Sequence, residues 1–318
     1  MPRRIVDPVE LFDAARSGDR SALARLLSLV EQGGEGAKEL GRLTYPLGGG
    51  AYTVGLTGAP GAGKSTLTSA LIGLLRGQGE EVAVLAIDPS SPFSGGAILG
   101  DRVRMQDHAT DPGVFIRSMA TRGHLGGLAL AAPQAIRLLD AVGRQMVLVE
   151  TVGVGQVEVE IAGKADTTVV VVNPGWGDSV QANKAGLMEI ADVFAINKAD
   201  RKGVDETRRD LELMLDLSEL GEWRPPIVAT VASRGDGVTE LWDAVGQHRA
   251  YAERSGLLAQ RRERRLAEEL RKIVEVRLEQ RARQLCSGES FAAIEAAVLE
   301  RTIDPWAAAD QMLEGIGA

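Results

Sequence analysis

Seven short apolar runs constrain the fold of this 318-residue chain more than any other feature. They are 51–58 (AYTVGLTG), 81–88 (EVAVLAID), 113–119 (GVFIRSM), 145–150 (QMVLVE), 167–173 (TTVVVVN), 192–197 (DVFAIN) and 225–232 (PPIVATVA). The runs are rich in β-branched residues, and helix-compatible segments separate most of them. Strands that read as continuous apolar runs are buried on both faces of a sheet. The pattern therefore predicts an α/β fold with a doubly wound, mostly parallel sheet in one domain.

Helical patterns precede and follow these runs. Leu23, Leu26, Leu27 and Val30 recur at helical spacing, and the glycines of 31–39 (EQGGEGAKE) then predict a linker. After about residue 255 we expect a long charged helix, a break at CSGES and two shorter helices. The apolar stripe of the long helix is Leu266, Leu270, Ile273, Val274 and Leu278. Such a helical arm either folds back on its own domain or pairs with a second subunit.

Charge and composition exclude several classes of protein. A net charge of -8 and a pI near 5.2 argue against general binding to nucleic acid or to an anionic membrane. The basic stretch 261–272 (RRERRLAEELRK) is interleaved with glutamates, so we expect a solvated helix face with i,i+4 pairs. The one cysteine and three histidines disfavour a disulfide or a metal store. Neither a signal peptide nor a long apolar segment is present, which predicts a cytoplasmic protein.

The stretch 55–66 (GLTGAPGAGKST) follows the first run and opens a helical segment, the context that a Walker A phosphate loop requires. Gly58, Gly61 and Gly63 let backbone N–H groups turn toward phosphate oxygens. Lys64 supplies a positive charge for the β and γ phosphates, and Ser65 supplies a hydroxyl for Mg²⁺. The start of the helix adds partial positive charge. We therefore predict that this loop binds a nucleoside triphosphate.

A second motif, 196–200 (INKAD), ends the sixth run and indicates the base. In N-K-x-D, the carboxylate of Asp200 would accept from guanine N1–H and its exocyclic amine, which adenine does not present in that pattern. Asn197 would orient the loop, and the stem of Lys198 would pack on the base. The backbone of 233–235 (SRG), after the seventh run, could close over the guanine edge. The motif favours GTP over ATP.

Three acidic residues are candidates for the surroundings of the metal. Asp88 ends the second run, Asp101 lies in 98–105 (ILGDRVRM), and Glu150 ends the fourth run. Octahedral Mg²⁺ takes one or two carboxylates together with a hydroxyl, phosphate oxygens and waters. Common small GTPases have D-x-x-G at the position where this chain has E-T-V-G. The longer side chain of Glu150 could hold a metal-bound water, whereas an aspartate would touch the metal more directly.

Taken together and in this order, the motifs GAPGAGKST, AIDPSSPFSGGAILGDRVRM, GHLGG, VETVGVGQ, NPGWGD and NKAD resemble the MeaB/ArgK/methylmalonic aciduria type A family. These are P-loop GTPases of the class that includes signal-recognition and metallochaperone GTPases. The resemblance implies a chaperone for an adenosylcobalamin-dependent acyl-CoA mutase, usually methylmalonyl-CoA mutase. Such chaperones gate cofactor loading and protect the mutase, and they couple both to GTP hydrolysis. The resemblance also implies a homodimer held partly by the C-terminal helices.

The sequence pattern divides the chain into an N-terminal helical extension over 1–45, a P-loop GTPase domain over 46–255 and a C-terminal helical arm over 256–318. The resemblance gives this arm a role in dimerisation and assigns family roles to residues of the chain. Lys184, in 173–186 (NPGWGDSVQANKAG), resembles a lysine that reaches the nucleotide when the mutase is bound. The nucleotide-binding set is Gly58, Ala59, Pro60, Gly61, Ala62, Gly63, Lys64, Ser65, Thr66, Asn197, Lys198, Asp200, Ser233, Arg234 and Gly235. The metal set is Ser65, Asp88, Asp101 and Glu150, and the catalytic set is Lys64, Asp101, Glu150 and Lys184.

Two other functions remain as alternatives. A metal-insertion GTPase of the urease or hydrogenase accessory type has the same scaffold but normally uses Cys or His ligands, of which this chain has few. A kinase associated with amino-acid transport is the second alternative, although no protein-kinase signature is present. Only an assay that finds the phosphate on a partner protein instead of in water would support the kinase.

Overall fold

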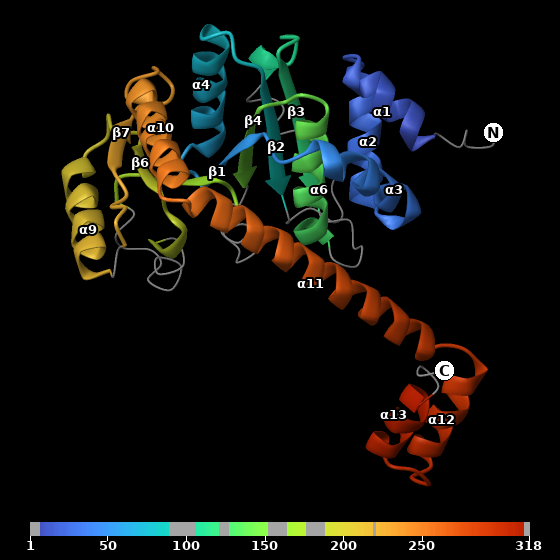
Figure 1. Ribbon diagram of the computed structural model, residues 1–318. Helices are drawn as coiled ribbons and strands as arrows, with labels where there is room; N and C mark the ends of the chain where they lie inside the picture. Colours follow the sequence, from blue (N-terminus) through green and yellow to red (C-terminus); the bar gives the residue numbers. More distant parts are fainter. Residues whose placement is uncertain are drawn as a thin grey trace. The chain divides into compact units, whose positions relative to one another are not determined.

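The computed structural model describes residues 7–88, 106–120, 127–151, 164–175, 188–218 and 221–314. At its centre is a seven-stranded sheet in which all paired strands are parallel (Figure 1). In chain order the strands are β1 (Tyr52–Gly58), β2 (Val82–Asp88), β3 (Val114–Ala120), β4 (Met146–Thr151), β5 (Thr167–Val172), β6 (Val193–Asn197) and β7 (Ile227–Thr230). Each predicted run corresponds to one strand, so the α/β fold with a parallel sheet is confirmed.

The strand order across the sheet is β3-β2-β4-β1-β5-β6-β7, which puts β1 at the centre. Leu56 of β1 pairs with Glu150 of β4, and Gly58 pairs with Val171 of β5. Because the strands are parallel, their carboxyl ends meet at one edge of the sheet, which we call the carboxyl edge. We call the opposite one the amino edge. The order brings the end of β1 between the ends of β4 and β5.

Helices cover both faces of the sheet (Figure 1). On one face, α4 (Lys64–Gly77) and α10 (Val238–Arg254) share a buried apolar cluster with β1, β2, β4, β5 and β6. On the other face, α6 (Gly127–Ala141) packs over β2, β3 and β4, and α9 (Val204–Leu217) packs over β5 and β6. The strand residues in these clusters are almost completely inaccessible to solvent. Burial on both faces explains why the strands are apolar along their whole length.

Three N-terminal helices join the core instead of preceding it as a separate piece. They are α1 (Pro8–Arg16), α2 (Arg20–Gln32) and α3 (Gly34–Thr44), followed by the 3₁₀ turn η1 (Tyr45–Leu47). The predicted linker over 31–39 is wrong, because α3 occupies most of it. Leu40 is buried in the cluster that α6 and the sheet form, and this burial outweighs the low helix propensity of the glycines. A largely buried ion pair between Glu31 and Arg117 of β3, at 2.7 Å, also joins the helices to the sheet.

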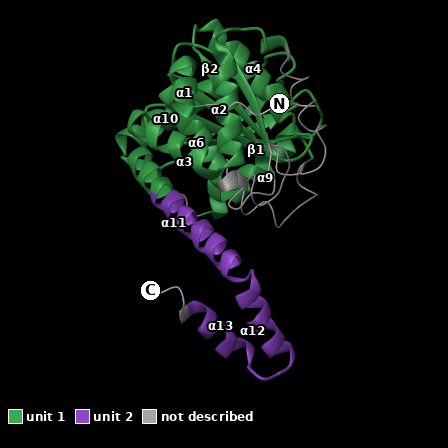
Figure 2. Ribbon diagram, turned by 90° about the vertical axis from the view of Figure 1, so that its right-hand side faces the viewer, with its two compact units in different colours: residues 1–266 green, residues 267–318 purple. Residues whose placement is uncertain are grey.

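The chain divides into two compact units after Leu266, as the colours of Figure 2 show. The first unit contains the sheet and the helices described above, together with the 3₁₀ turn η2 (Gln106–His108) and the start of α11 (Leu257–Leu285). The second contains the rest of α11, α12 (Glu289–Leu299) and α13 (Pro305–Glu314). A long helix followed by a break and two shorter helices is the pattern that the sequence predicted.

The apolar stripe of α11 is exposed, whereas part of its basic stretch is not. In the second unit, Leu270 and Leu278 each keep 63% of their surface accessible. In the first unit, Arg261, Arg262 and Arg265 are only partly exposed and bind aspartates far away in the sequence. The expected solvated face with i,i+4 pairs is therefore wrong for these three arginines. The sequence showed nearby glutamates, and the distant aspartates became partners only through the fold.

Candidate functional site

The phosphate loop joins the end of β1 to the start of α4. Gly58 has φ 130°, and a Cβ there would stand 2.0 Å from the carbonyl oxygen of Val171 on β5. Only glycine fits so close to the neighbouring strand. Gly61 and Gly63 also have positive φ values, 70° and 92°. This is the strand, glycine-rich turn and helix geometry that the Walker A motif predicted.

Lys64 begins α4 and is buried beneath the loop that it follows. Its Nζ donates to the carbonyl oxygens of Gly58, at 2.8 Å, and Ala59, at 3.1 Å. The side chain therefore folds back toward the start of the loop, where two carbonyl oxygens hold its charge. An ammonium group in this position can attract phosphate oxygens without any change in the path of the backbone.

Asn197, at the end of β6, connects the two predicted nucleotide motifs. Its Nδ2 donates to the carbonyl oxygen of Ala62 in the phosphate loop at 2.8 Å, and its Oδ1 accepts from Ala232 N–H at 3.1 Å and Thr230 Oγ1 at 3.2 Å. A Cβ on Gly63 would stand 2.4 Å from the same Nδ2. Asn197 is itself almost fully buried. One amide thus fixes the end of β6 against both the phosphate loop and the segment after β7.

The rest of the N-K-x-D motif forms a tight turn beside the phosphate loop. Lys198 has φ 60°, which is unusual for a residue with a side chain, and its Nζ donates to the carbonyl oxygen of Gly61 at 2.6 Å. The N–H of Ala199 donates to the carbonyl oxygen of Thr230. Asp200 is exposed in the same turn. A carboxylate that is accessible and held by an ordered turn can accept hydrogen bonds from a base.

The segment after β7 lies at the same edge. Ser233, Arg234 and Gly235 are exposed in the turn that leads into α10, and Gly235 has φ 80°. Arg234 pairs with Asp236 at 2.9 Å on the surface. The bonds from Ala232 and Thr230 to Asn197 tie this turn to the N-K-x-D loop. The structure therefore brings the phosphate loop, the N-K-x-D loop and the 233–235 turn together.

Glu150 and Ser65 form a deeply buried polar pair in the site. The hydroxyl of Ser65 donates to Glu150 Oε1 at 2.5 Å, and both residues are almost inaccessible to solvent. Because its proton is used in this bond, the oxygen of Ser65 keeps lone pairs with which it can bind a cation. The hydroxyl and the carboxylate are both hard oxygen donors of the kind that Mg²⁺ prefers. The pair fits a magnesium ion bound together with a nucleotide.

In the part of this region that the structure describes, protein side chains form no cage for a metal ion. Over the described ranges, no group of three or more His, Cys, Asp or Glu side chains could hold a metal ion. Mg²⁺ dehydrates reluctantly, and at phosphate sites it keeps waters and uses phosphate oxygens. One hydroxyl and one carboxylate are consistent with that mode of binding.

The side chains of three predicted site residues lie outside the described structure. Asp88 ends β2 beside β4, and only its backbone belongs to the described structure. Asp101 and Lys184 lie outside the described residues. Their metal-binding and catalytic roles stay predictions.

Sequence reasoning missed several residues that support the site. Thr151, directly after Glu150, donates to Thr57 Oγ1 at 3.1 Å and to the carbonyl oxygen of Leu56 at 3.3 Å, which ties β4 to β1 just before the phosphate loop. Thr230, at the end of β7, was also missed, and its hydroxyl donates to Asn197 Oδ1. Buried threonines at strand ends were the available signal, but β-branched residues are common in strands and do not stand out there.

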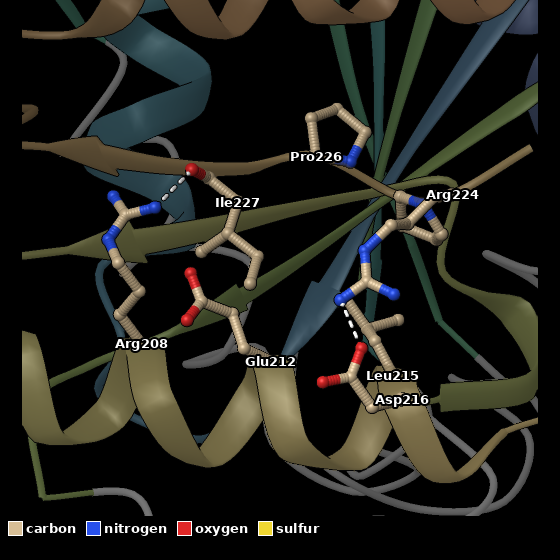
Figure 3. Close-up of a pocket in the computed structure, with 8 residues that line it drawn as sticks. Arg208, Glu212, Leu215, Asp216, Arg224, Pro226 and Ile227 are labelled. Atoms are coloured by element: carbon tan, nitrogen blue, oxygen red, sulfur yellow. Dashed lines mark hydrogen bonds and ion pairs between the residues drawn. The ribbon is translucent and has the colours of Figure 1, made fainter.

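A shallow hollow of about 290 Å³ lies between α9 and the segment before β7 (Figure 3). Arg224 pairs with Asp216 at 2.7 Å there, and Arg208 donates to the carbonyl oxygen of Ile227 at 2.9 Å. None of the predicted nucleotide-binding residues lines the hollow. It is separate from the site at the carboxyl edge.

The chain matches the family model described as "Methylmalonyl Co-A mutase-associated GTPase MeaB" over residues 23–287. A protein of Pyrococcus abyssi that is provisionally named a GTPase is 54% identical over 312 residues, with 96% of each chain covered. The GTPase ArgK of Escherichia coli is 39% identical, with 82% of this chain and 81% of that protein covered. The mitochondrial methylmalonic aciduria type A homolog of Mus musculus is 35% identical, with 82% and 67% covered.

A solved structure agrees with these relationships. The crystal structure of a protein named LAO/AO transport system kinase matches with a TM-score of 0.72 and 30% identity, over 99% of this chain and 100% of that one. The family model covers more than half of the chain, and the phosphate and N-K-x-D loops lie within the matched residues. This chain belongs to the MeaB family of methylmalonyl-CoA mutase-associated GTPases.

Proposed function

We propose that this GTPase is a chaperone that binds an adenosylcobalamin-dependent acyl-CoA mutase, gates the loading of its cofactor and protects it from inactivation. The observation that carries the proposal is the meeting of the phosphate and N-K-x-D loops in a chain that matches the mutase-associated family over residues 23–287. The similarity to the mouse methylmalonic aciduria type A homolog supports a mutase as the partner. Methylmalonyl-CoA mutase is the first candidate.

The nucleotide is held at two ends in this proposal. Backbone N–H groups of 58–66 and the ammonium of Lys64 bind the phosphates, while Asp200 accepts from the edge of guanine. Ser65 holds Mg²⁺, with Glu150 fixing the orientation of its hydroxyl through the 2.5 Å hydrogen bond. A bound Mg²⁺ would neutralise the charge that develops on the phosphate oxygens. Lys64 adds a fixed positive charge in a buried position, where it acts more strongly than in water.

We expect slow hydrolysis by the isolated protein, because the mutase would complete the site through Lys184. Lys184→Ala should then remove the acceleration by the mutase and leave GTP binding unchanged. The acceleration is measured as phosphate release with and without methylmalonyl-CoA mutase, and GTP binding is measured by titration with a fluorescent GTP analogue. Lys202→Ala, at an exposed lysine near the N-K-x-D loop, is the matched control. Equal stimulation of parent and Lys184→Ala would contradict the role of Lys184.

The partner is tested by binding in defined nucleotide states. The tagged protein, loaded with GDP or with a nonhydrolysable GTP analogue, is mixed with methylmalonyl-CoA mutase and with an extract of the source cell. A complex with a cobalamin mutase in one of the two states is the expected result. Binding of GDP and GTP without mutase capture in either state would refute the chaperone proposal and leave the GTPase intact.

A homodimer held by the arm is the second part of the proposal. The exposed stripe of α11, with Leu270 and Leu278 at its centre, is a long apolar surface on a helix otherwise rich in charge. Replacing both leucines with glutamate should convert a dimer into a monomer in light-scattering measurements. Leu217→Glu, at an exposed leucine of α9 in the first unit, should leave the mass unchanged. A monomeric parent would contradict the dimer.

A protein kinase is the other candidate, since the protein in the matched crystal structure is named a transport system kinase. The two functions differ in the acceptor of the γ-phosphoryl group, which is water for a GTPase and a protein hydroxyl for a kinase. Radiolabelled GTP with the mutase present should give free phosphate only. Label retained on a protein would favour the kinase.

A further inference from the structure

Two buried aspartates mark the amino edge of the sheet, opposite the nucleotide site. Asp166 immediately precedes β5, and Asp192 immediately precedes β6. Their side chains are 1% and 4% exposed. Charged carboxylates are rarely buried so completely unless they are paired.

The carboxylate of Asp192 is surrounded by polar groups from three elements. The N–H of Thr168 on β5 donates to Oδ2 at 2.8 Å. The guanidinium of Arg261 on α11 binds both oxygens, at 2.8 and 2.9 Å. Nε2 of the buried His248 on α10 lies 3.1 Å from Oδ1. A bidentate guanidinium and a strand N–H fix both the position and the orientation of the group.

Asp166 has the same arrangement on the neighbouring strand. Its Oδ2 accepts from the N–H of Thr53 on β1 at 3.0 Å and from Arg262 at 2.8 Å, while Arg265 pairs with Oδ1. Each carboxylate accepts a hydrogen bond from an N–H of the neighbouring strand, from Thr168 for Asp192 and from Thr53 for Asp166. The carboxylates thereby extend the hydrogen bonding of the sheet beyond the strand ends. In each case, arginines from the first turns of α11 supply the opposite charge. The start of α11 is thereby joined to β5 and β6.

β6 is unusual because buried polar residues fix both of its ends. The strand has only five residues, and Asp192 and Asn197 bracket its path. At the carboxyl end, Asn197 binds the phosphate loop and the segment after β7. An extended strand advances about 3.3 Å per residue and does not stretch further, so a displacement of Asp192 along the strand moves Asn197 with it. β5 differs at its carboxyl end, where the following Asn173 donates to the carbonyl oxygen of Pro174, whereas Asn197 donates to the phosphate loop.

We propose that Arg261 of α11 is a positioning residue for guanine recognition, which it controls through Asp192 and β6. The inference rests on the proposed nucleotide site, in which Asp200 reads the base three residues after Asn197. Helix α11 therefore contributes to base specificity from the amino edge of the sheet. The pair of Arg262 on α11 and Asp166, which precedes the adjacent strand β5, contributes to stability without affecting specificity.

The test measures discrimination instead of affinity alone. GDP and IDP differ in the exocyclic amine that Asp200 would bind, and we expect the parent to prefer GDP by roughly tenfold or more. In full-length Arg261→Gln the ratio of the two dissociation constants should fall by about fivefold, because a small displacement of the reading carboxylate weakens its contact. Partial unfolding lowers the fraction of active protein but leaves the ratio unchanged, so the ratio separates positioning from stability.

Matched variants and a second readout complete the experiment. Arg262→Gln should lower the melting temperature and keep the parent ratio, and Arg271→Gln, at an exposed arginine of the same helix, should change neither. If Arg261→Gln does not fold, Arg261→Lys, which keeps the charge and loses the bidentate contact, is measured in the same way. A parent ratio in a folded Arg261 variant would overturn the proposal.

Hydrogen exchange without nucleotide separates this inference from the proposed site. Segment 193–200 should exchange faster in the Arg261 variant than in Arg262→Gln. A parent that does not distinguish GDP from IDP, together with this faster exchange, would refute guanine reading and support the mechanical link through β6. Exchange equal in both variants would overturn the link.

Discussion

The carboxyl edge and the amino edge of the parallel sheet differ in how their polar groups are arranged. At the carboxyl edge, glycines with positive φ and backbone carbonyls surround single polar side chains such as Lys64 and Asn197. At the amino edge, side-chain charges are buried and paired, with Asp166 and Asp192 each held by arginines of α11. The first edge has donors that can be directed to a ligand, whereas the second has already satisfied its charges within the protein. The comparison predicts that substitutions at one edge affect turnover, and that most substitutions at the other affect stability.

The largest effect should come from Lys64→Ala at the carboxyl edge. Removing a preorganised charge from a buried phosphate site should lower GTP turnover by roughly a thousandfold. Phosphate release measures the loss, and the free energy of unfolding in urea should change little, because the hydrogen bonds from Lys64 described above go to carbonyls of its own loop. A large loss of stability with normal turnover would reverse the proposed division between the edges.

Asp166→Asn should give the largest effect at the amino edge. It leaves Arg262 and Arg265 with a neutral partner, and breaking a buried ion pair costs about 3 kcal/mol of unfolding free energy. Asp216→Asn is the control, since its pair with Arg224 is more than half exposed on both sides and should cost less than about 0.5 kcal/mol. Urea unfolding measures both variants. Equal effects would show that burial does not set the strength of these pairs.

Gly63→Ala tests the backbone geometry of the carboxyl edge. The new Cβ would stand 2.4 Å from Asn197 Nδ2, so the link between the two loops must shift, and we expect GDP affinity to fall by roughly thirtyfold. Gly61→Ala also places a side chain at a positive φ, but its Cβ meets no atom within 4 Å. The difference between the two, measured by calorimetry, isolates the contact with Asn197. Identical losses would assign the effect to φ alone.

The smallest predicted effect is the response of the amino edge to acid. Burial opposes ionisation of Asp166 and Asp192, but the hydrogen bonds and charges of Arg262 and Arg265, and of His248 and Arg261, lower the pKa of each carboxyl overall. A carboxyl whose pKa is lower in the folded state adds stability above its unfolded pKa, near about pH 4, and loses it as the pH falls further.

Urea unfolding at about pH 7, 5, 4 and 3 measures this response, and we expect a loss of about 1 kcal/mol of unfolding free energy from these two groups. Asp192→Asn should be less stable at neutral pH and should show a shallower decline toward acid. A decline as steep as that of the parent would exclude Asp192 as a source of the acid response.

The parts of the molecule that the sequence predicted well are those encoded by neighbouring residues. Each strand is a local apolar run, and the phosphate loop depends on glycines within a few positions of Lys64. The N-K-x-D turn is equally local, although its tie to Ala62 joins residues 135 positions apart. In each case, the residue types alone limit the backbone to a few conformations.

The parts that sequence reasoning missed depend on long-range packing. α3 forms despite its glycines because Leu40 is buried against α6 and the sheet. Arg261, Arg262 and Arg265 looked like surface residues, because adjacent glutamates offered pairs at helical spacing. Their partners are 69 to 99 positions away in the sequence and come close only in the folded chain. No pattern within a short window identifies such a pair.

The bond from Asn197 to the phosphate loop has a thermodynamic consequence. Because the amide of Asn197 joins the N-K-x-D loop to the phosphate loop, we expect that ordering either loop lowers the entropy that remains to be lost in ordering the other. Guanosine and pyrophosphate, added as separate molecules, should therefore bind cooperatively. Linkage requires the coupling to be reciprocal, so each fragment should tighten the other by the same factor.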